Sequence, residues 1–544
     1  MIKTPESHLS IKFLGGCEQF GMNCMIIGNG SEEIVVDCGI NISDLEHYGI
    51  NYEIPDPQIF AEHKDKIKAY VITHGHQDHI GALDKMMNIV KAPIYATSYT
   101  MEIIKKKNLG RHYDSSLFHL LRNKKSCELT DQIKVTSYFT YHSIPHTTSL
   151  LFDFAGTKIF HSGDFKLSSN NLGNYNLKKL KHEIGKVKIM LCDSTGALDD
   201  TLSGSERNVE DSLANLINGA KNRIIITSFS SNIPRVKSIL NVARKTGKKV
   251  AFIGKSMHSY FDAARQTKVL SGYSNTIIKE NKIKSLPDEK LIILISGSQG
   301  EFNSALTRSS KSGTRRFSFK PSDTFIYSAR EIPGNEAKIN QIKSNIIKLG
   351  VNIIDQSCLE QPLHVSGHGG AADIMNLIKI ISPEIFIPIH GDLRHLDAAA
   401  NLAENLIKET IIPHNGDLLT WVNNHWHREN EELNFIKYDY PGDYEIEEKT
   451  FKQRKKLAFC GAAAISIILN GDEILGKPDI TFIGTGKTDE HKRIKSTMAT
   501  LIEATSGNVS SPEKLEIHLK KELGKYLKSV FGKKPSLLIN IHVL

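Results

Sequence analysis

Short apolar runs that end in glycine or polar residues recur along the first 200 residues. They lie at residues 11–14, 34–39, 69–72, 133–141, 158–161 and 187–192. Their length and their content of branched and aromatic residues are typical of strands. Beyond the third run, apolar residues return at helical spacing, at Ile80, Leu83, Met87 and Val90. The sequence therefore predicts a strand-to-helix turn at residues 73–79.

The rhythm changes after about residue 210, where strand signals alternate with helical ones. The strand signals lie at residues 224–227, 250–253, 291–295 and 324–327, and an amphipathic helix is expected at 334–350. This alternation is typical of βαβ units in a parallel sheet. Each strand ends in Ser, Gly or Lys, and ligands of open α/β sheets bind at such carboxyl ends.

A strand at residues 384–389 then resumes the first domain, and a chain of 544 residues is too long for a single core. Residues 441–456 are charged, contain Pro-Gly and lack apolar periodicity, so they are predicted to be a linker. The predicted organisation is a first domain of residues 1–210 and 371–440, an inserted domain of residues 211–370, the linker, and a small α+β domain of residues 457–544.

The turn at residues 73–79 concentrates candidate metal ligands. His74, His76, Asp78 and His79 form an H-x-H-x-D-H pattern within six residues. In extended chain His74 and His76 share one face, whereas Asp78 and His79 point elsewhere, so one turn can serve two metal ions. A loop of surface polar residues is the alternative. Four candidate ligands so close together favour the metal site.

Further candidate ligands stand where predicted strands end. His142 follows the strand at 133–141, Asp164 the strand at 158–161, and His390 the strand at 384–389. A carboxylate at position 164 can bridge two metals. A ligand set of imidazole and carboxylate without cysteine suits Zn²⁺ and tolerates Mn²⁺.

Composition narrows the class of protein only slightly. The net charge is +9, which permits an anionic partner but equally fits a solvated lysine-rich surface. The predicted helix at 513–531 has a lysine-rich face that either keeps the surface solvated or binds a nucleic acid or another subunit. The lysines are Lys520, Lys521, Lys525 and Lys528. The seven cysteines contain no C-x-x-C pair, which excludes a thiolate zinc finger and a disulfide framework. No signal peptide or membrane span is evident, so a cytoplasmic protein without a membrane partner is expected.

The order of motifs along the chain is specific. It runs H-x-H-x-D-H, H-S-I-P, G-D-F-K, D-S-T, S-S-N, G-S-Q-G-E, I-P-G-N, H-V-S-G-H-G and P-I-H-G. This series resembles the ribonuclease J family, the β-CASP branch of the metallo-β-lactamase superfamily. The resemblance implies an α/β fold: an αβ/βα sandwich with an inserted parallel-sheet β-CASP domain and a small C-terminal α+β domain.

The resemblance also implies roles for individual residues. One metal would be held by His74, His76 and His142, a second by Asp78, His79 and His390, with Asp164 bridging; two Zn²⁺ ions, or Mn²⁺, are implied. His368 would donate a proton to the leaving 3′-oxygen or clamp the scissile phosphate, the alternative being a structural histidine. Asp193 would orient a histidine of the site, the alternative being a helix cap.

In the family a pocket for a terminal 5′-monophosphate lies one nucleotide from the metals. The matching residues are Ser231, Asn232, His364, Val365, Ser366, Gly367 and His368. For Ser231 and Asn232 the alternative is helix capping ahead of Pro234. The implied activity is 5′→3′ exonuclease on single-stranded, 5′-monophosphorylated RNA, with additional endonuclease activity, in mRNA decay and rRNA maturation. Homodimers or homotetramers through the C-terminal domain are also implied.

Two features depart from the family. His146 follows H-S-I-P where an aspartate is usual, and the segment 441–456 differs from the usual glycine-rich linker. Three other functions stay open: hydrolysis of small esters or thioesters, a DNA-directed β-CASP nuclease, and a non-catalytic RNA-binding subunit. The inserted domain of about 160 residues disfavours the first, because small substrates need no long channel. The intact ligand set disfavours the last.

Overall fold

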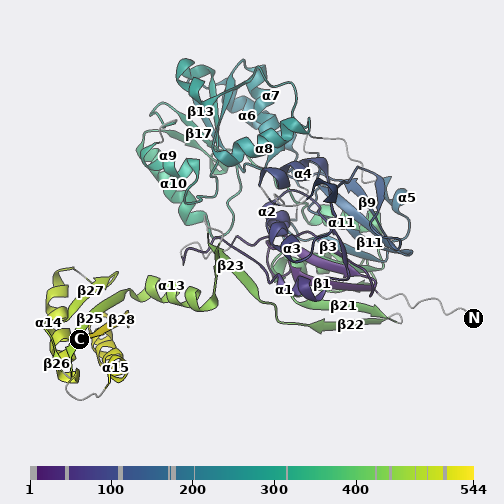
Figure 1. Cartoon of the computed structure of the whole chain (residues 1–544). Helices are drawn as coiled ribbons and strands as arrows, with labels where there is room; N and C mark the ends of the chain where they lie inside the picture. The colour runs from purple at the N-terminus through teal and green to yellow at the C-terminus, as the bar shows by residue number, and fades with distance from the viewer. Residues whose placement is uncertain are drawn as a thin grey trace, which may run out of the picture. The chain divides into compact units, whose positions relative to one another are not determined.

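The chain forms two compact units in a computed structural model (Figure 1). The first unit contains residues 1–42 and 53–435, and the second contains residues 43–52 and 436–544. The structure describes residues 9–544 except positions 43–47, 108, 110–113, 170–171, 173–178, 201–202, 314–316, 423–424, 440–443, 472, 487 and 507–510. None of the helices in these described segments combines the length and the hydrophobicity that crossing a membrane requires.

Two sheets of the first unit share one apolar core. The first sheet has the order β22 (His425–Asn430), β21 (Asp417–Val422), β1 (Leu9–Gly15), β2 (Cys24–Gly28), β3 (Glu33–Val36), β5 (Ile67–Val71), β6 (Ile94–Ala96) and β7 (Phe118–Leu120). The second has the order β20 (Glu409–Thr410), β19 (Ile385–Ile389), β12 (Ile189–Asp193), β11 (Thr157–His161), β10 (Thr148–Phe154), β9 (Ile133–Phe139) and β8 (Lys125–Glu128). Side chains of both sheets, such as Phe13 and Phe152, are fully buried in this core.

Helices cover the outer faces of both sheets. On the second sheet, α5 (Leu180–Ile184), α11 (Ala371–Ile381) and α12 (Leu393–Ala403) enclose a separate apolar cluster with Phe160 and Phe386. On the first, Phe60 of α1 (Gln58–Glu62) stacks on Tyr70 of β5. This is the predicted αβ/βα sandwich, and the α/β fold class is confirmed.

The helix predicted after the H-x-H-x-D-H turn is interrupted. It consists of α2 (Gln77–Ile80) and α3 (Leu83–Ile89). Between them Ala82 N donates to Cys38 O at 2.9 Å. A side chain at Gly81 would approach Gln77 O to 2.7 Å, so only glycine fits this turn. The spacing of Ile80 and Leu83 indicates helix but not the break, because the break depends on a hydrogen bond to the distant loop that follows β3.

The inserted domain is a parallel sheet of six strands, as the alternating pattern predicts. Its order is β15 (Ile277–Ile278), β14 (Lys249–Ile253), β16 (Leu291–Ile295), β13 (Ile224–Thr227), β17 (Thr324–Tyr327) and β18 (Asn352–Ile354), with every pairing parallel. The flanking helices are α6 (Glu206–Asn218), α7 (Ile233–Lys245), α8 (Lys255–Gln266), α9 (Ala305–Ser312) and α10 (Glu336–Lys348). The helix expected at 334–350 is α10.

This domain is tied to the sandwich through two helices. Helix α4 (Ser98–Lys106) packs against α8, and the Tyr99 hydroxyl donates to Tyr260 O at 3.1 Å in the buried contact. The parallel sheet is therefore attached to the sandwich, and the carboxyl ends of its strands are the edge where a ligand of such a sheet would bind.

The second unit is built on a mixed sheet. Strand β25 (Ala462–Asn470) pairs with β26 (Glu473–Ile474), β27 (Asp479–Ile483) and, in parallel, β28 (Ser536–Val543). Helices α14 (His491–Ser506) and α15 (Pro512–Phe531) cover one face, and the leucines of α15 are buried there.

The predicted linker at 441–456 is more ordered than its composition indicates. Residues 441–443 lie outside the described residues, but β24 (Tyr444–Ile446) and α13 (Glu448–Cys460) follow. Helix α13 buries none of its side chains, which explains why the sequence shows no apolar period there. The larger segment of the second unit begins at Ile436, before the predicted start of the last domain at residue 457. The other domain boundaries stay predictions.

Candidate metal centre

The loop after β5 and the single turn of α2 carry four of the candidate ligands. Asp37, at the end of β3, fixes the loop: its carboxylate accepts hydrogen bonds from Thr73 N and from Thr73 Oγ1, both at 2.8 Å. The loop then presents His74 and His76, while Asp78 and His79 follow in the first turn of α2. Four of the predicted ligands thus come from one short loop and the helical turn that follows it.

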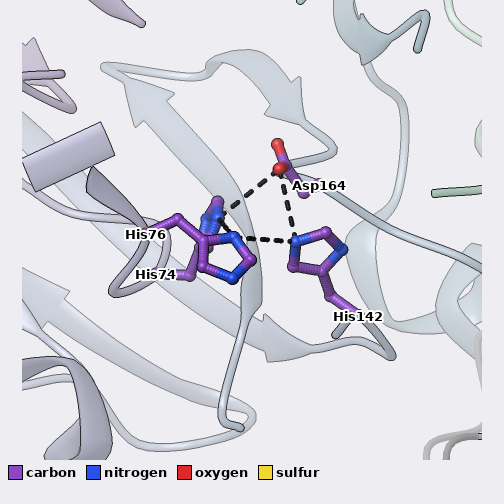
Figure 2. A group of neighbouring side chains, drawn as sticks. All are labelled: His74, His76, His142 and Asp164. Atoms are coloured by element: carbon purple, nitrogen blue, oxygen red, sulfur yellow. Dashed lines mark hydrogen bonds and ion pairs between the residues drawn. The ribbon is translucent and has the colours of Figure 1, made fainter. Parts of the chain in front are cut away.

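Four side chains converge on a first point, as Figure 2 shows. His76 Nδ1 lies 3.0 Å from His74 Nε2 and 3.1 Å from His142 Nε2. Asp164 Oδ2 lies 3.4 Å from His74 Nε2 and 3.5 Å from His142 Nε2. We call this group of His74, His76, His142 and Asp164 the first subsite.

A second point is surrounded by Asp78, His79 and His390. Asp78 Oδ2 lies 3.5 Å from both His79 Nε2 and His390 Nε2. The carboxylate of Asp164 reaches this group too, with Oδ1 at 3.4 Å from His79 Nε2 and Oδ2 at 3.6 Å from His390 Nε2. We call these residues with Asp164 the second subsite. The structure therefore brings all seven predicted ligands together, with Asp164 between the two groups.

The outer ring nitrogens of the histidines fix their tautomers. Thr73 Oγ1 donates to Asp37, so it accepts from His74 Nδ1 at 3.0 Å; Thr195 Oγ1 donates to Asp193 and accepts from His390 Nδ1 at 2.7 Å. His142 Nδ1 donates to Gly367 O at 2.8 Å. In each case a proton sits on Nδ1, so Nε2 is the ring nitrogen that faces the centre and that would bind a metal ion once it carries no proton.

His390 shows most directly that the site fits a cation. Its Nε2 is buried and has no hydrogen-bond partner in the part of the chain that the structure describes. Buried ring nitrogens normally have a partner, and an exception calls for an explanation such as an ion. Carboxylate oxygens of Asp78 and Asp164 are the nearest anionic atoms. A divalent ion between these oxygens and Nε2, taking the place of any proton on that nitrogen, would satisfy all three groups.

The pKa values of the histidines are lowered in the first subsite and raised in the second. Burial lowers the pKa of His74 and His142, and it lowers that of His76 to about 4. Burial acts the same way on His390, but the carboxylates of Asp164, Asp78 and Asp193 outweigh it and raise its pKa to about 9. The pKa of His79 is raised in the same way, because Asp164, Asp78 and Asp37 outweigh its burial.

These shifts predict that the two subsites release different numbers of protons when metal binds. At pH 7 the histidines of the first subsite are already neutral. His79 and His390 are positively charged, and each carries a second ring proton that the metal ion must displace. The second equivalent of metal should release about two protons and bind more weakly as the pH falls below 9. Calorimetric titration in buffers of different ionisation enthalpy measures this; equal proton release by both equivalents would contradict it.

His368 and Asp193 form a pair at the rim of the centre. His368 Nδ1 donates to Asp193 Oδ2 at 2.7 Å, and its Nε2 lies 3.9 Å from Asp164 Oδ2. The other carboxylate oxygen of Asp193 accepts from Thr195 N and Oγ1, so Asp193 also supports His390. Burial alone would lower the pKa of His368, but Asp193 and Asp164 raise it. The contact with His368 favours the orienting role over the helix cap that was its alternative.

The loop 363–368 adjoins the first subsite. Gly367 O holds His142, Ser366 Oγ accepts from His368 N at 3.0 Å, and Ser366 O accepts from Lys166 Nζ at 2.9 Å. Val365 has no polar side-chain group, and its side chain is buried, so it fills space beneath this loop. His364 Nδ1 is buried without a hydrogen-bond partner among the residues described.

The loop at Ser231 and Asn232 meets this segment through Arg235. Asn232 Oδ1 accepts from Arg235 N at 3.1 Å and caps α7, so the capping alternative fits this atom, while Ser231 is half-buried. Arg235 is fully buried, pairs with Glu206 at 2.5 Å and donates to Leu363 O at 2.9 Å. The two predicted parts of the phosphate pocket are therefore neighbours.

Several residues that complete the centre are not predicted by the sequence patterns. Asp37 and Thr195 orient ligand histidines, and Lys166 and Arg235 hold the loop 363–368. Asp37 had a usable signal, since it ends an apolar run just as Asp164 and Asp193 do. Its positive φ of 59° also marks a special backbone position, which sequence does not reveal for a non-glycine residue.

His146, which departs from the family pattern, lies outside both subsites. Its φ is 56°, its Nδ1 lies 3.2 Å from Ser98 Oγ, and its ring stacks on Phe139 with centroids 5.2 Å apart. Burial lowers its pKa, so the ring is neutral at pH 7. These contacts describe a packing role next to α4.

Replacing Asp37 by asparagine is predicted to weaken metal binding by about 10- to 100-fold. Asp37 Oδ2 accepts the Nδ1 proton of His79 at 2.8 Å, and an amide in its place makes that bond weaker and its orientation ambiguous. Competition with a chelating dye measures the affinity. Asp288→Asn, which breaks only the ion pair with Lys320 at half-exposed positions, is the matched control and should bind like the wild type. An unchanged affinity in Asp37→Asn would contradict the orienting role.

Three family models match successive parts of the chain. The metallo-beta-lactamase superfamily model matches residues 18–219, the ribonuclease J beta-CASP domain model residues 221–346, and the model of the Zn-dependent metallo-hydrolase RNA specificity domain residues 357–413. These matches and the cluster of histidines and carboxylates identify the centre as a site for divalent metal.

Relatives match the chain over nearly its whole length. A ribonuclease J of Sinorhizobium meliloti is 31% identical and covers 97% of this chain and 96% of its own. Ribonuclease J 1 of Streptococcus pyogenes is 31% identical and covers 88% of this chain and 87% of its own. Ribonuclease J of Thermus thermophilus is 28% identical and covers 98% of this chain and 95% of its own. A crystal structure from Enterococcus faecalis, titled as a protein of unknown function, matches with a TM-score of 0.56 and 15% identity, covering 76% of this chain and 100% of that one. That likeness supports the fold alone.

Proposed function

The chain belongs to the ribonuclease J family and is a metal-dependent ribonuclease, and from this premise we propose that it degrades RNA from the 5′ end, preferring 5′-monophosphate ends, with additional endonuclease activity. The observation that carries the proposal is the hydrogen bond from His142 Nδ1 to Gly367 O. It couples a ligand of the first subsite directly to the loop proposed to bind the terminal phosphate. A phosphate held there lies close enough to the metal centre to set the cut near the chain end.

We propose two Zn²⁺ ions as the resident metals, with Mn²⁺ as an alternative. Bound at the two subsites, they would supply a nucleophilic water at neutral pH and electrostatic stabilisation of the phosphodiester transition state. The chain's own residues then do the rest. His368 holds a proton on Nε2 facing the centre, where it serves the leaving 3′-oxygen, and Asp193 keeps that imidazole protonated and oriented.

The charge around the loop 363–368 suits a dianion. Burial lowers the pKa of His364, and the neighbouring cations of Arg235, Lys166 and Arg330 lower it further. Burial also lowers the pKa of Lys166, to about 8. Such crowding of cations favours an anionic ligand, and His364 Nδ1, which has no hydrogen-bond partner within the described residues, can donate to it. Ser231, Ser366 Oγ and backbone groups at Gly367 complete the proposed set.

A substrate panel tests this function. We expect mononucleotide release from 5′-monophosphate RNA, slower release from 5′-triphosphate and 5′-hydroxyl RNA, and no activity with chelator. His364→Ala should lower the preference for monophosphate over hydroxyl ends about 10- to 100-fold, because one hydrogen bond to a charged group is lost. His427→Ala, at an exposed position on β22, is the matched control. Faster cleavage of matched single-stranded DNA, or turnover of a thioester alone, would favour the alternative functions.

We further propose that the chain forms homodimers or homotetramers through its second unit and acts in cytoplasmic mRNA decay and rRNA maturation. Exposed apolar side chains on one sheet face of that unit support the assembly. Leu538 pairs with Ala464 across β28 and β25, and Ile483 pairs with Ala462 across β27 and β25, with 63% and 64% exposure for the two larger residues. Light scattering from the full chain measures the assembly state.

A further inference from the structure

An exposed aromatic side chain stands beside the second subsite. Phe20, in the loop between β1 and β2, is 37% exposed, and its ring centroid lies 6.5 Å from that of the ligand His390. Because about a third of its surface stays in water, Phe20 gains less from burial than a phenylalanine in the core. Its position beside the second subsite therefore indicates a role at the site more strongly than a scattered exposed apolar residue would.

The loop that carries Phe20 is fixed to the metal ligands. Phe20 O accepts from Asn23 Nδ2 at 3.2 Å, and the same amide group contacts Asp78 O and His79 Nε2, each at 3.2 Å. At the other end of the loop His390 N donates to Gly16 O at 2.7 Å. Glu18 and Met22 have positive φ values of 61° and 62°, which non-glycine residues adopt only when their surroundings hold them there. The ring is thus held in place before any substrate binds.

A second ring supports Phe20 from α12. His395 meets it edge-on, with centroids 4.8 Å apart and an interplanar angle of 77°. His395 is itself fixed, because its Nδ1 contacts Asp392 Oδ1 at 2.7 Å and Asp392 caps the helix. This edge contact leaves part of the Phe20 ring uncovered, as the exposed fraction shows.

We propose that Phe20, held by His395, stacks on the base of the second nucleotide of bound RNA, the one 3′ of the scissile phosphate. The proposal rests on the proposed function for its direction. The terminal phosphate pocket borders the first subsite at His142 and Gly367, whereas Phe20 borders the second subsite at His390. A strand with its 5′ end in the pocket and its first linkage between the subsites places its second nucleotide on the Phe20 side. Single-stranded RNA is commonly bound by such stacking, which tolerates any base.

Removing the base of the second nucleotide and removing the Phe20 ring should weaken RNA binding by a similar factor. The two changes together should weaken it no more than either one alone. The experiment compares 5′-monophosphate RNA with an otherwise identical RNA that has an abasic second nucleotide. Equilibrium dissociation constants come from fluorescence anisotropy of 3′-labelled RNAs with non-hydrolysable linkages bound to the metal-loaded protein, so that no cleavage interferes. For the wild type we expect the abasic RNA to bind about 5- to 150-fold more weakly. For Phe20→Ala we expect intact RNA to lose a similar factor and the abasic RNA to lose nothing more.

Matched variants separate stacking from damage to the loop. Phe20→Leu keeps apolar bulk without a π face and should discriminate poorly between the two RNAs, whereas Phe20→Trp should discriminate at least as well as the wild type. Phe459→Ala, at a 69% exposed position in the second unit, should discriminate like the wild type. With hydrolysable RNA, Phe20→Ala should raise KM rather than lower kcat.

Two results would overturn the inference. One is a wild type that binds intact and abasic RNA equally, a test that needs no variant to fold. The other is a Phe20→Ala protein that still discriminates as strongly as the wild type. Failure of the proposed function looks different: the metal-loaded wild type would not release mononucleotides from intact RNA, while the binding ratios would still decide on Phe20.

Discussion

Asp164→Asn will slow RNA cleavage at least about 10³-fold and leave the protein unable to hold two metal ions together. The physical reason is the position of one carboxylate. Its two oxygens lie 3.4 Å from His74 Nε2 and from His79 Nε2, so one oxygen faces a ligand of each subsite. Nearby imidazoles outweigh burial and lower the pKa of Asp164, so it is anionic at neutral pH. An amide removes the shared negative charge while keeping the shape, which isolates the electrostatic contribution.

Single-turnover cleavage with excess enzyme and metal analysis of dialysed protein measure the two effects of Asp164→Asn. Asp479→Asn, at an exposed position in the second unit, is the matched control and should keep both metals and full activity. An Asp164→Asn protein with two tightly bound ions and activity within tenfold of the wild type would show that Asp164 is not a shared ligand.

His368→Ala will lower the single-turnover rate constant about 10²- to 10⁴-fold, the range for loss of a positioned general acid. A general acid must be protonated, so the wild-type rate constant should fall as the pH rises through the pKa of His368. Asp193 and Asp164 hold that pKa above the ordinary value of 6.5. The rate constant of His368→Ala should no longer show this alkaline decline.

Asp193→Asn provides the matched test of the same pair. It removes the carboxylate that accepts from His368 Nδ1 at 2.7 Å, so the pKa of His368 should drop and the alkaline decline should move to lower pH. A purely structural His368 would give equal losses at every pH in both variants. Rate–pH profiles of the three proteins, taken under single-turnover conditions with saturating metal, measure the difference.

The sequence was informative where a feature depends on neighbours along the chain. The strand ends that carry His142, Asp164 and His390, and the H-x-H-x-D-H turn, follow from local periodicity, and the structure brings these residues together. The parallel sheet of the inserted domain follows from its alternating pattern.

Features that depend on distant contacts were not predictable from local patterns. Asp37 matters because it meets Thr73 and His79 after folding, and Arg235 because it reaches Leu363 O. The sequence predicts a linker over most of helix α13, because this helix buries no side chain and so leaves no apolar period. Phe20 looks like any loop phenylalanine until the bonds at Asn23 and Gly16 place it beside His390.

The most direct measurement is anomalous diffraction from crystals of the full chain grown with Zn²⁺ or Mn²⁺. We expect two anomalous peaks, one bounded by His74, His76 and His142, the other by Asp78, His79 and His390, with Asp164 touching both. Crystals in ample metal that show no peak among these residues, with their imidazoles and carboxylates turned away from one another, would contradict the two-metal site.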